Sequence, residues 1–514
     1  MRWGKLWGFI AVFLLAEPAW SQATQKQITF DYVIGLAKER AQKPFRPAKS
    51  DLPEQLRGDK LNYDSYREIE FKHDKALWRD NNSPFRMEFF HPGYLYQTPV
   101  KINEFNTTHV QPIRFVQDFF NYRKLKVDRI PADSGYAGFR LLNCLNDSNR
   151  WDEVATFLGS SYFRMLGKDQ RYGTSARGLA LDCGETNRQE EFPTFTDWWL
   201  QKPEKGNETL HFFGLLDSVS CAGAYEFLLR PGETTFAEVT ATVFMRDGAD
   251  PKTVGVAPLT SMFWFGENSE KKPDDYRPEV HDTDGLLIRS AQDEFTWRPL
   301  QNPIALQHQI FAMSGIRGFG LLQRDRNFAN YQDIFNLYQQ TPSVWIEPRG
   351  DWGVGEVHLV ELPTTFEGAD NIVAFWSPKE KPRAGQEFRI AYTLQWSLRP
   401  DGKFAPCKVV QTRFGKDPGD QKKRQVVIDF EANNILPLSS DVPQVDLKTS
   451  GNSPVENVQV FKNDIGKTWR VIFSLSPKEN DPGLVDIRCA LVSSEKTLSE
   501  TWNYQWKPSQ NGGN

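Results

Sequence analysis

The sequence predicts a mostly β protein built from two domains. Short runs that alternate apolar and polar residues follow one another along most of the chain, which is the pattern of half-buried strands. Turn signals such as His91-Pro92-Gly93 and Arg246-Asp247-Gly248 separate these runs. The length of 514 residues also exceeds that of one ordinary domain. Many short strands joined by turns predict a β-sandwich or a β-barrel.

The first 21 residues have the order of a secretory signal peptide. Two basic residues precede an apolar run from about Leu6 to Ala16, and Ala19-Trp20-Ser21 offers small residues for cleavage. This run is shorter than the roughly 20 residues that span a bilayer, and no twin-arginine pair is present. We therefore expect export to the periplasm by the general secretion route, with cleavage after Ser21 or, as second choice, after Ala23.

Two helices are predicted near the start of the mature chain. Residues 30–41 have apolar side chains near helical spacing, with Asp31 as the expected N-cap. A shorter helix is expected over 51–57, with Asp51 as its cap and Pro53 in its first turn. Strands are predicted from there on, and clear examples are 85–90, 236–244 and 356–362.

We place the first domain at residues 22–398, a turn-rich linker at 399–406 and a second domain at 407–511. The second domain has about 100 residues of alternating strands, which fits an immunoglobulin-like sandwich. Its expected strands are 407–412, 426–430, 469–475 and 501–506.

The composition narrows the range of partners. The 62 Lys and Arg residues nearly balance the 66 Asp and Glu residues, and the basic residues are scattered. Nucleic acid is therefore not expected as a partner. The aromatic content is high, with 16 Trp, 15 Tyr and 37 Phe. Most of these rings are expected in the core, but rings left at a surface suit sugars, whose C–H faces stack on aromatic planes.

Five cysteines remain after export, and their odd number leaves at least one unpaired. No CxxC spacing favours zinc. Cys407 and Cys489 both fall in the second domain and could form a disulfide in an oxidising compartment. For Cys144, Cys183 and Cys221 we expect free, buried thiols.

Motif searching excludes several enzyme classes. The sequence has no phosphate-binding loop with a Lys, no HExxH and no GxSxG. It does have carboxylates among aromatic and glycine residues in three segments, 276–286, 345–353 and 361–376. Glycosidases need two carboxyl groups on opposite sides of the glycosidic oxygen, one of them protonated. For each single Asp the alternative is a structural turn, and for 281–285 it is a calcium loop that lacks its remaining ligands.

Several stretches resemble the OpgG and OpgD family of periplasmic glucan biosynthesis proteins, also called MdoG and MdoD. They are spread over nearly the whole mature chain, and the missing twin-arginine signal favours the G type. The matching stretches are 159–164, 172–180, 256–263, 276–279, 318–324, 370–376 and 497–502.

The resemblance implies a large galactose mutarotase-like β-sandwich (a supersandwich) with a long groove, followed by the immunoglobulin-like domain. It also implies a role in making osmoregulated periplasmic glucans and an inverting hydrolysis of their β-1,2-linked glucose backbone. In this interpretation Asp370 is the general acid, and Asp282 lies on the proton path from the attacking water, acting through a chain of hydroxyls. Glu367 and Tyr338 map to the groove.

At the start of a strand and beside an apolar wall, burial would raise the pKa of Asp370 and keep it protonated. We expect β-1,2-glucan chains as partners, with a membrane glucan synthase as a further partner. The sequence requires no cofactor and no metal, and it does not fix the oligomeric state. The alternative function is a non-catalytic glucan-binding or assembly factor that works with such a synthase. The residues expected to bind substrate are Trp352, Trp376, Trp264, Tyr276, Arg277 and Asp351.

Overall fold

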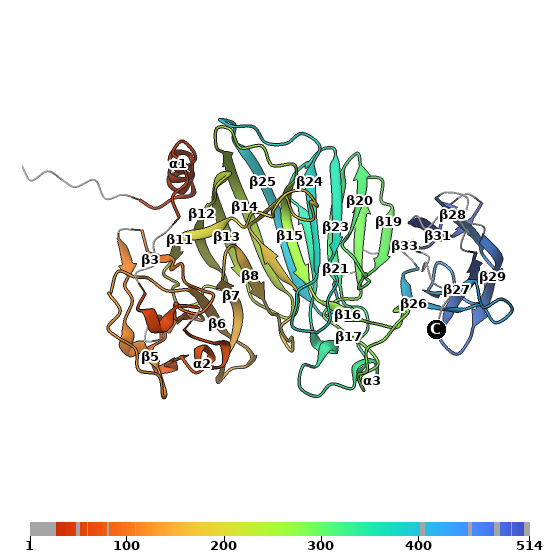
Figure 1. Ribbon diagram of the computed structural model, residues 1–514, viewed down its shortest axis with the longest axis horizontal. Coiled ribbons are helices and arrows are strands. Elements are labelled where there is room, and N and C mark those ends of the chain that lie inside the picture. Colours follow the sequence, from red (N-terminus) through yellow and green to blue (C-terminus); the bar gives the residue numbers. More distant parts are fainter. Residues whose placement is uncertain are drawn as a thin grey trace, which may run out of the picture.

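The structure is a computed structural model that describes residues 27–507, except 48–51, 59, 80–81, 108, 401–406, 451–454, 477–483 and 495. The expected signal peptide and most of the expected linker lie outside the described residues. Within them the chain is mostly β, as predicted, with short helices only (Figure 1).

Two large sheets contain most of the strands. The ten-stranded sheet follows the order β2 (Arg86–Phe90), β6 (Gly138–Asp147), β7 (Arg150–Leu158), β8 (Tyr162–Met165), β9 (Ser175–Arg177), β15 (Val254–Ser261), β24 (Ile372–Pro378), β23 (Gly355–Glu361) and β20 (Gln307–Met313), with β10 (Leu179–Leu181) paired to β15. The fifteen-stranded sheet follows the order β28 (Gln444–Thr449), β31 (Val485–Ser493), β33 (Thr501–Trp506), β19 (Phe295–Pro299), β18 (Gly285–Ser290), β21 (Ile316–Leu322), β22 (Ser343–Pro348), β25 (Phe388–Ser397), β14 (Thr235–Met245), β13 (Cys221–Arg230), β12 (Leu210–Asp217), β11 (Thr194–Gln201), β3 (Lys101–Phe105) and β4 (Val110–Ile113), with β32 (Lys496–Thr497) paired to β31.

The main core lies between these two sheets. Phe157 of β7 packs against Trp198 of β11 and Phe212 of β12, with ring centroids 4.9 and 5.4 Å apart. Such aromatic contacts join one sheet to the other because alternate side chains of each strand point inward. The two-layer arrangement fits a β-sandwich, whereas the narrower galactose mutarotase-like class stays a prediction.

Smaller elements complete the fold. Two-stranded sheets form between β1 (Glu70–Phe71) and β5 (Phe120–Asn121), and between β16 (Phe263–Phe265) and β17 (Val280–His281). The remaining short helices are α2 (Tyr63–Arg67), α3 (Phe328–Tyr331), η2 (His73–Lys75), η3 (Gln117–Phe119) and η4 (Tyr338–Gln340).

The first predicted helix is confirmed as α1 (Phe30–Ala41), but its cap is Thr29, whose Oγ1 accepts a hydrogen bond from the N–H of Tyr32 at 3.2 Å. Asp31 lies inside the first turn instead. The second predicted helix is wrong in length, because only the 3-10 turn η1 (Glu54–Leu56) forms. Its N-cap is Pro53, and the chain is already extended at Arg57. The expected cap Asp51 lies outside the described residues.

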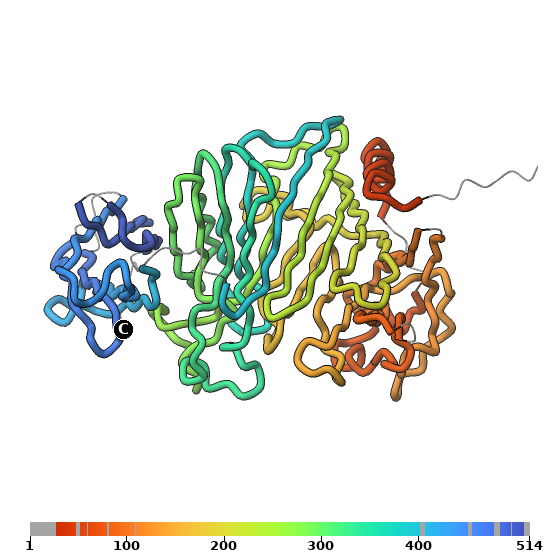
Figure 2. The backbone as a smooth tube through the Cα atoms, turned by 180° about the vertical axis from the view of Figure 1, so that it is seen from behind, coloured from red at the N-terminus to blue at the C-terminus, as the bar shows by residue number. Residues whose placement is uncertain are grey.

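The C-terminal region combines a sheet of its own with strands of the large sheet. β26 (Val409–Lys416), β27 (Arg424–Glu431), β30 (Thr468–Leu475) and β29 (Val455–Asn463) form a four-stranded sheet. β33 instead pairs in parallel with β19, so that Trp502 lies opposite Trp297. Figure 1 and Figure 2 show this region at one end of the molecule, beside the large sheets. The boundaries of the two predicted domains stay a prediction.

The predicted disulfide is wrong, because Cys407 and Cys489 are both free and fully buried. Each thiol has its own surroundings: Cys407 lies beside Asn433, whereas Cys489 pairs within the sheet with Leu447 and Trp502. Burial raises the pKa of Cys407 to about 11. The other three cysteines are also free, although Cys144 is only partly buried.

Candidate active site

Loops at one end of β23 and β24 gather the acidic residues that the sequence singled out. The loop between these two strands carries Glu367 and Asp370, Asp282 directly follows β17, and Tyr338 begins η4. Asn371 holds this loop in place: its amide donates to the carbonyls of Phe263 (3.0 Å) and Leu362 (2.9 Å), and its Oδ1 accepts from the N–H of Phe263 (2.8 Å). Because Asn371 is buried, the backbone next to Asp370 is fixed.

Asp282 is held by its backbone at the base of this cluster. Its N–H donates to the carbonyl of Met262 at 2.9 Å, and its own carbonyl accepts from the hydroxyl of Thr341 at 2.7 Å. Burial and the nearby charge of Asp370 raise the pKa of Asp282 to about 7, although the charge of Arg164 acts in the opposite direction. A carboxyl group that titrates near neutral pH can accept or release a proton during catalysis.

Asp370 is more open to solvent than the sequence suggested. Its side chain is 33% exposed, and its Oδ2 lies 3.4 Å from Nη2 of Arg164. The apolar residues Ile372 and Val373 that follow it are buried, but Asp370 itself precedes them on the loop. The side chain of Asp370 is therefore only partly buried, and the apolar wall begins two residues after it.

Glu367, Tyr338 and Arg277 form a connected group beside these two aspartates. Oε2 of Glu367 accepts hydrogen bonds from the Tyr338 hydroxyl at 2.7 Å and from Nη1 of Arg277 at 2.6 Å. Burial and the bond to Glu367 raise the pKa of Tyr338 above its ordinary value. The negative charge of Asp282 also raises the pKa of Tyr338. Tyr338 is therefore close enough to both carboxylates to be influenced by each.

Arg277 is a structural residue more than a free substrate ligand. Its side chain is only 8% exposed and contacts three carboxylates. Nη2 donates to Asp275 at 2.8 Å and Nη1 to Asp333 at 2.9 Å, in addition to the bond with Glu367. Its charge is thus matched inside the protein, and its assignment to substrate binding stays a prediction.

Three buried hydroxyl groups are connected to one another, beginning at the residue after Asp282. The Thr174 hydroxyl donates to Ser261 Oγ at 3.3 Å, and Ser261 Oγ lies 2.8 Å from Thr283 Oγ1. Thr283 is the residue after Asp282. The sequence analysis expected a chain of hydroxyls but did not identify its members. It also missed Arg164, although this residue is the last of the matched stretch 159–164 and could have been recognised from it.

Three of the predicted substrate-binding residues do not join the cluster. The ring of Trp376 is 1% exposed and belongs to the main core. Asp351 and Trp352 lie before Gly355, which pairs with Pro378 at the end of β24 far from Asp370. Seven-residue strands separate the two ends by roughly 20 Å.

Both of these distant residues have structural partners instead. Oδ1 of Asp351 accepts the N–H of Gly353 at 2.8 Å, as in an Asx turn. The indole of Trp352 donates to the carbonyl of Ala391 at 3.1 Å.

The remaining two rings do lie near the cluster. Tyr276 is 74% exposed and directly precedes Arg277. Trp264 is half-buried and packs in a small apolar cluster that also contains Tyr331 and Tyr338.

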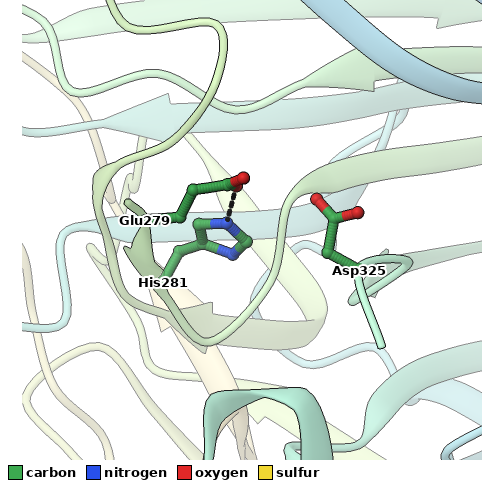
Figure 3. A group of neighbouring side chains, drawn as sticks. All are labelled: Glu279, His281 and Asp325. Atoms are coloured by element: carbon green, nitrogen blue, oxygen red, sulfur yellow. Dashed lines mark hydrogen bonds and ion pairs between the residues drawn. The ribbon is translucent and has the colours of Figure 1, made fainter. Parts of the chain in front are cut away.

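A second polar cluster lies behind the site, in which Asp325 faces the pair formed by Glu279 and His281 (Figure 3). Their potential ligand atoms lie within 4.8 Å of one another, and one imidazole with carboxylates could hold a divalent cation. Burial and the neighbouring Glu279 raise the pKa of Glu267 to about 8, and burial raises that of Asp325 well above its ordinary value. Glu279 and His281 already contact each other at 3.0 Å, and the expected absence of a metal stays a prediction.

The fold and the cluster together define a class: a β protein of two packed sheets with an acid-rich site on the loops at one end of its strands. A family model described as "Periplasmic glucan biosynthesis protein, MdoG" matches residues 28–506. Glucans biosynthesis protein G of Pseudomonas aeruginosa is 40% identical over 512 residues, which cover 97% of this chain and 95% of that protein. The protein of the same name from Serratia proteamaculans is 39% identical and covers 98% of this chain and 96% of its own length. The chain belongs to the MdoG family of periplasmic glucan biosynthesis proteins.

The family description places its members in the periplasm, as the sequence predicted. Across the described part of the chain, no helix has both the length and the apolar composition to cross a membrane.

Proposed function

We propose that this protein cleaves the β-1,2-linked backbone of periplasmic glucans with inversion at the anomeric carbon. The observation that carries this proposal is the convergence of Asp282, Glu367 and Asp370, from two separate loops, at one end of β24. Inverting glycosidases need one carboxyl group to protonate the leaving oxygen and a second to activate water on the opposite face of the sugar.

The roles follow from the positions of these groups. Asp370, which is accessible to solvent, donates a proton to the glycosidic oxygen. Water attacks the anomeric carbon from the other face, and its proton passes toward Asp282. The pKa of Asp282 near 7 suits a proton acceptor at neutral pH. The hydrogen bond between Tyr338 and Glu367 fixes the two side chains relative to each other. In this position they orient the sugar or the water.

Incubation with linear β-1,2-glucan tests the proposal, with products measured by mass spectrometry. The wild-type protein is expected to yield shorter glucans, and Asp370→Asn is expected to yield none while it still binds the substrate. An unchanged glucan with the wild-type protein would contradict the enzymatic role.

A second candidate function is a non-catalytic glucan-binding or assembly factor working with a membrane glucan synthase. The contact between Arg164 and Asp370 favours it, because a carboxylate beside an Arg is a good acceptor for sugar hydroxyls. In that case neither the wild-type nor the Asp370→Asn protein would cleave glucan, and Asp370→Asn would bind it more weakly than the wild type because the charged acceptor is lost.

We further propose that residues 1–21 direct export and are then removed. The N-terminal sequence of protein purified from the periplasm is expected to begin at Gln22. A mature protein that begins at Met1 would contradict this.

A further inference from the structure

Three exposed aromatic rings lie on the loops that form the candidate site. Tyr276 is 74% exposed, Phe335 83% and Phe366 57%. Large apolar side chains that are exposed as a group mark binding surfaces more often than single exposed ones do. Of the tryptophans that the sequence suggested, Trp376 is buried, Trp352 lies at the other end of the strands, and Trp264 is half-buried. The exposed rings on these loops are Tyr276, which the sequence also suggested, and Phe335 and Phe366, which it did not.

The buried Arg277 connects the three loops that carry these rings. Tyr276 precedes Arg277 in the chain, Phe366 precedes its partner Glu367, and Phe335 lies two residues after its partner Asp333. Consecutive Cα atoms are only about 3.8 Å apart, so the backbone of Phe335 and of Phe366 lies close to a residue bonded to this guanidinium group. The guanidinium carbon is 5.9 Å from the centroid of the Tyr276 ring. We call these three residues the aromatic rim.

The loops of the aromatic rim are held in one conformation. Oδ1 of Asp333 accepts the N–H groups of Phe335 at 2.8 Å and Asn336 at 2.9 Å. The Phe366 ring lies against Gly368, where a Cβ atom would come within 2.5 Å of the ring. A loop whose backbone is already ordered loses little conformational entropy when a ligand binds.

The charges around the aromatic rim argue for a neutral ligand. Arg277 is the only cation bonded to Asp275, Asp333 and Glu367 among the described residues, so this group carries net negative charge. An anionic ligand would be repelled, and a cation would have to compete with Arg277. A neutral sugar chain, with apolar C–H faces and hydroxyls that can bond to Glu367, fits both the rings and the carboxylates.

We propose that the aromatic rim binds neutral glucose units of a glucan chain next to the bond held by Asp370, and that it sets the affinity for long chains. The inference rests on the proposed glucan substrate. It differs from the catalytic assignment because it concerns binding, which is measured separately from cleavage.

The test measures the affinity for linear β-1,2-glucan by isothermal titration calorimetry, in the Asp370→Asn protein so that the ligand stays intact. Phe335→Ala and Phe366→Ala are each expected to weaken binding about tenfold. Phe461→Ala is the matched control, because Phe461 is 46% exposed on β29 in the C-terminal region, and it is expected to leave the affinity unchanged. Because the rings are exposed, their removal should not unfold the protein, which thermal melting checks.

Two results would overturn the inference. One is unchanged affinity in both rim variants, which would show that these rings do not bind the glucan and leave another ligand, such as a protein partner, for them. The other is a lack of glucan binding in the parent protein. If the rim variants lose binding and the wild-type protein does not cleave glucan, the role of the aromatic rim is supported and the proposed glucanase activity is contradicted.

Discussion

The two ends of β23 and β24 look alike in sequence and differ in structure. Each end has a loop in which carboxylates stand among aromatic and glycine residues, 345–353 at one end and 361–371 at the other. At the first end Asp351 only closes a turn and Trp352 packs on the core. At the second end Asp282, from another part of the chain, joins Glu367 and Asp370. Residue composition therefore suggests where a site could lie. A site forms only where separate segments of the chain bring such residues together.

The largest expected difference between the two ends concerns turnover. Asp282→Asn removes the proton acceptor and is expected to lower glucan cleavage by about 1,000-fold, within the usual range for general acid–base catalysis. Asp351→Asn, at the other end, should cleave at the wild-type rate. Initial rates of reducing-end release measure both. Equal losses in the two variants would mean that both ends act on the substrate.

Arginine variants sharpen the comparison through stability. Arg277→Ala leaves the buried carboxylate of Asp333 unpaired and is expected to cost about 3 kcal/mol in the free energy of unfolding. Arg349→Ala removes only a surface pair with Glu238, in which both side chains are 44% exposed, and is expected to cost about 0.5 kcal/mol or less. Urea unfolding of both variants checks the difference. A similar decrease in the free energy of unfolding for both variants would show that Arg277 does not stabilise the loops that it contacts.

A smaller effect is expected from the pH dependence of stability. The folded-state pKa of Asp282 is raised to about 7 from an ordinary value near 4, so the folded protein binds its proton more tightly than the unfolded chain does. The stability that this proton contributes is complete at low pH and is lost as the pH rises from about 4 through 7.

Asp282→Asn, which stays neutral, should therefore stabilise the protein relative to wild type by about 2 kcal/mol more at pH 8 than at pH 5.5. Asp351→Asn is the control and should show the same difference from wild type at both values. Denaturant unfolding at the two pH values gives the result, and a stabilisation by Asp282→Asn that is equal at both would contradict the raised pKa.

Sequence patterns predicted the mostly β fold and α1 well, because alternation and helical spacing reflect local burial. They failed where the outcome depends on distant partners. The free Cys407 and Cys489 lie in separate surroundings, and Trp376 turned out to be a core ring.

In the candidate site, the family resemblance suggested Asp282, Glu367, Asp370 and Tyr338, of which only Asp370 lies in a matched stretch, and the structure brings these four side chains together. Arg164 and Ser261 both lie in matched stretches, but their contacts could not be predicted, because these contacts join segments that no local pattern connects.

The most direct test of the central claim follows the anomeric protons of the first products by NMR while the wild-type protein acts on linear β-1,2-glucan. The account predicts that new reducing ends form first as the α-anomer and later equilibrate, with no signal from Asp370→Asn. New ends that form first as the β-anomer, or the absence of new ends, would contradict it.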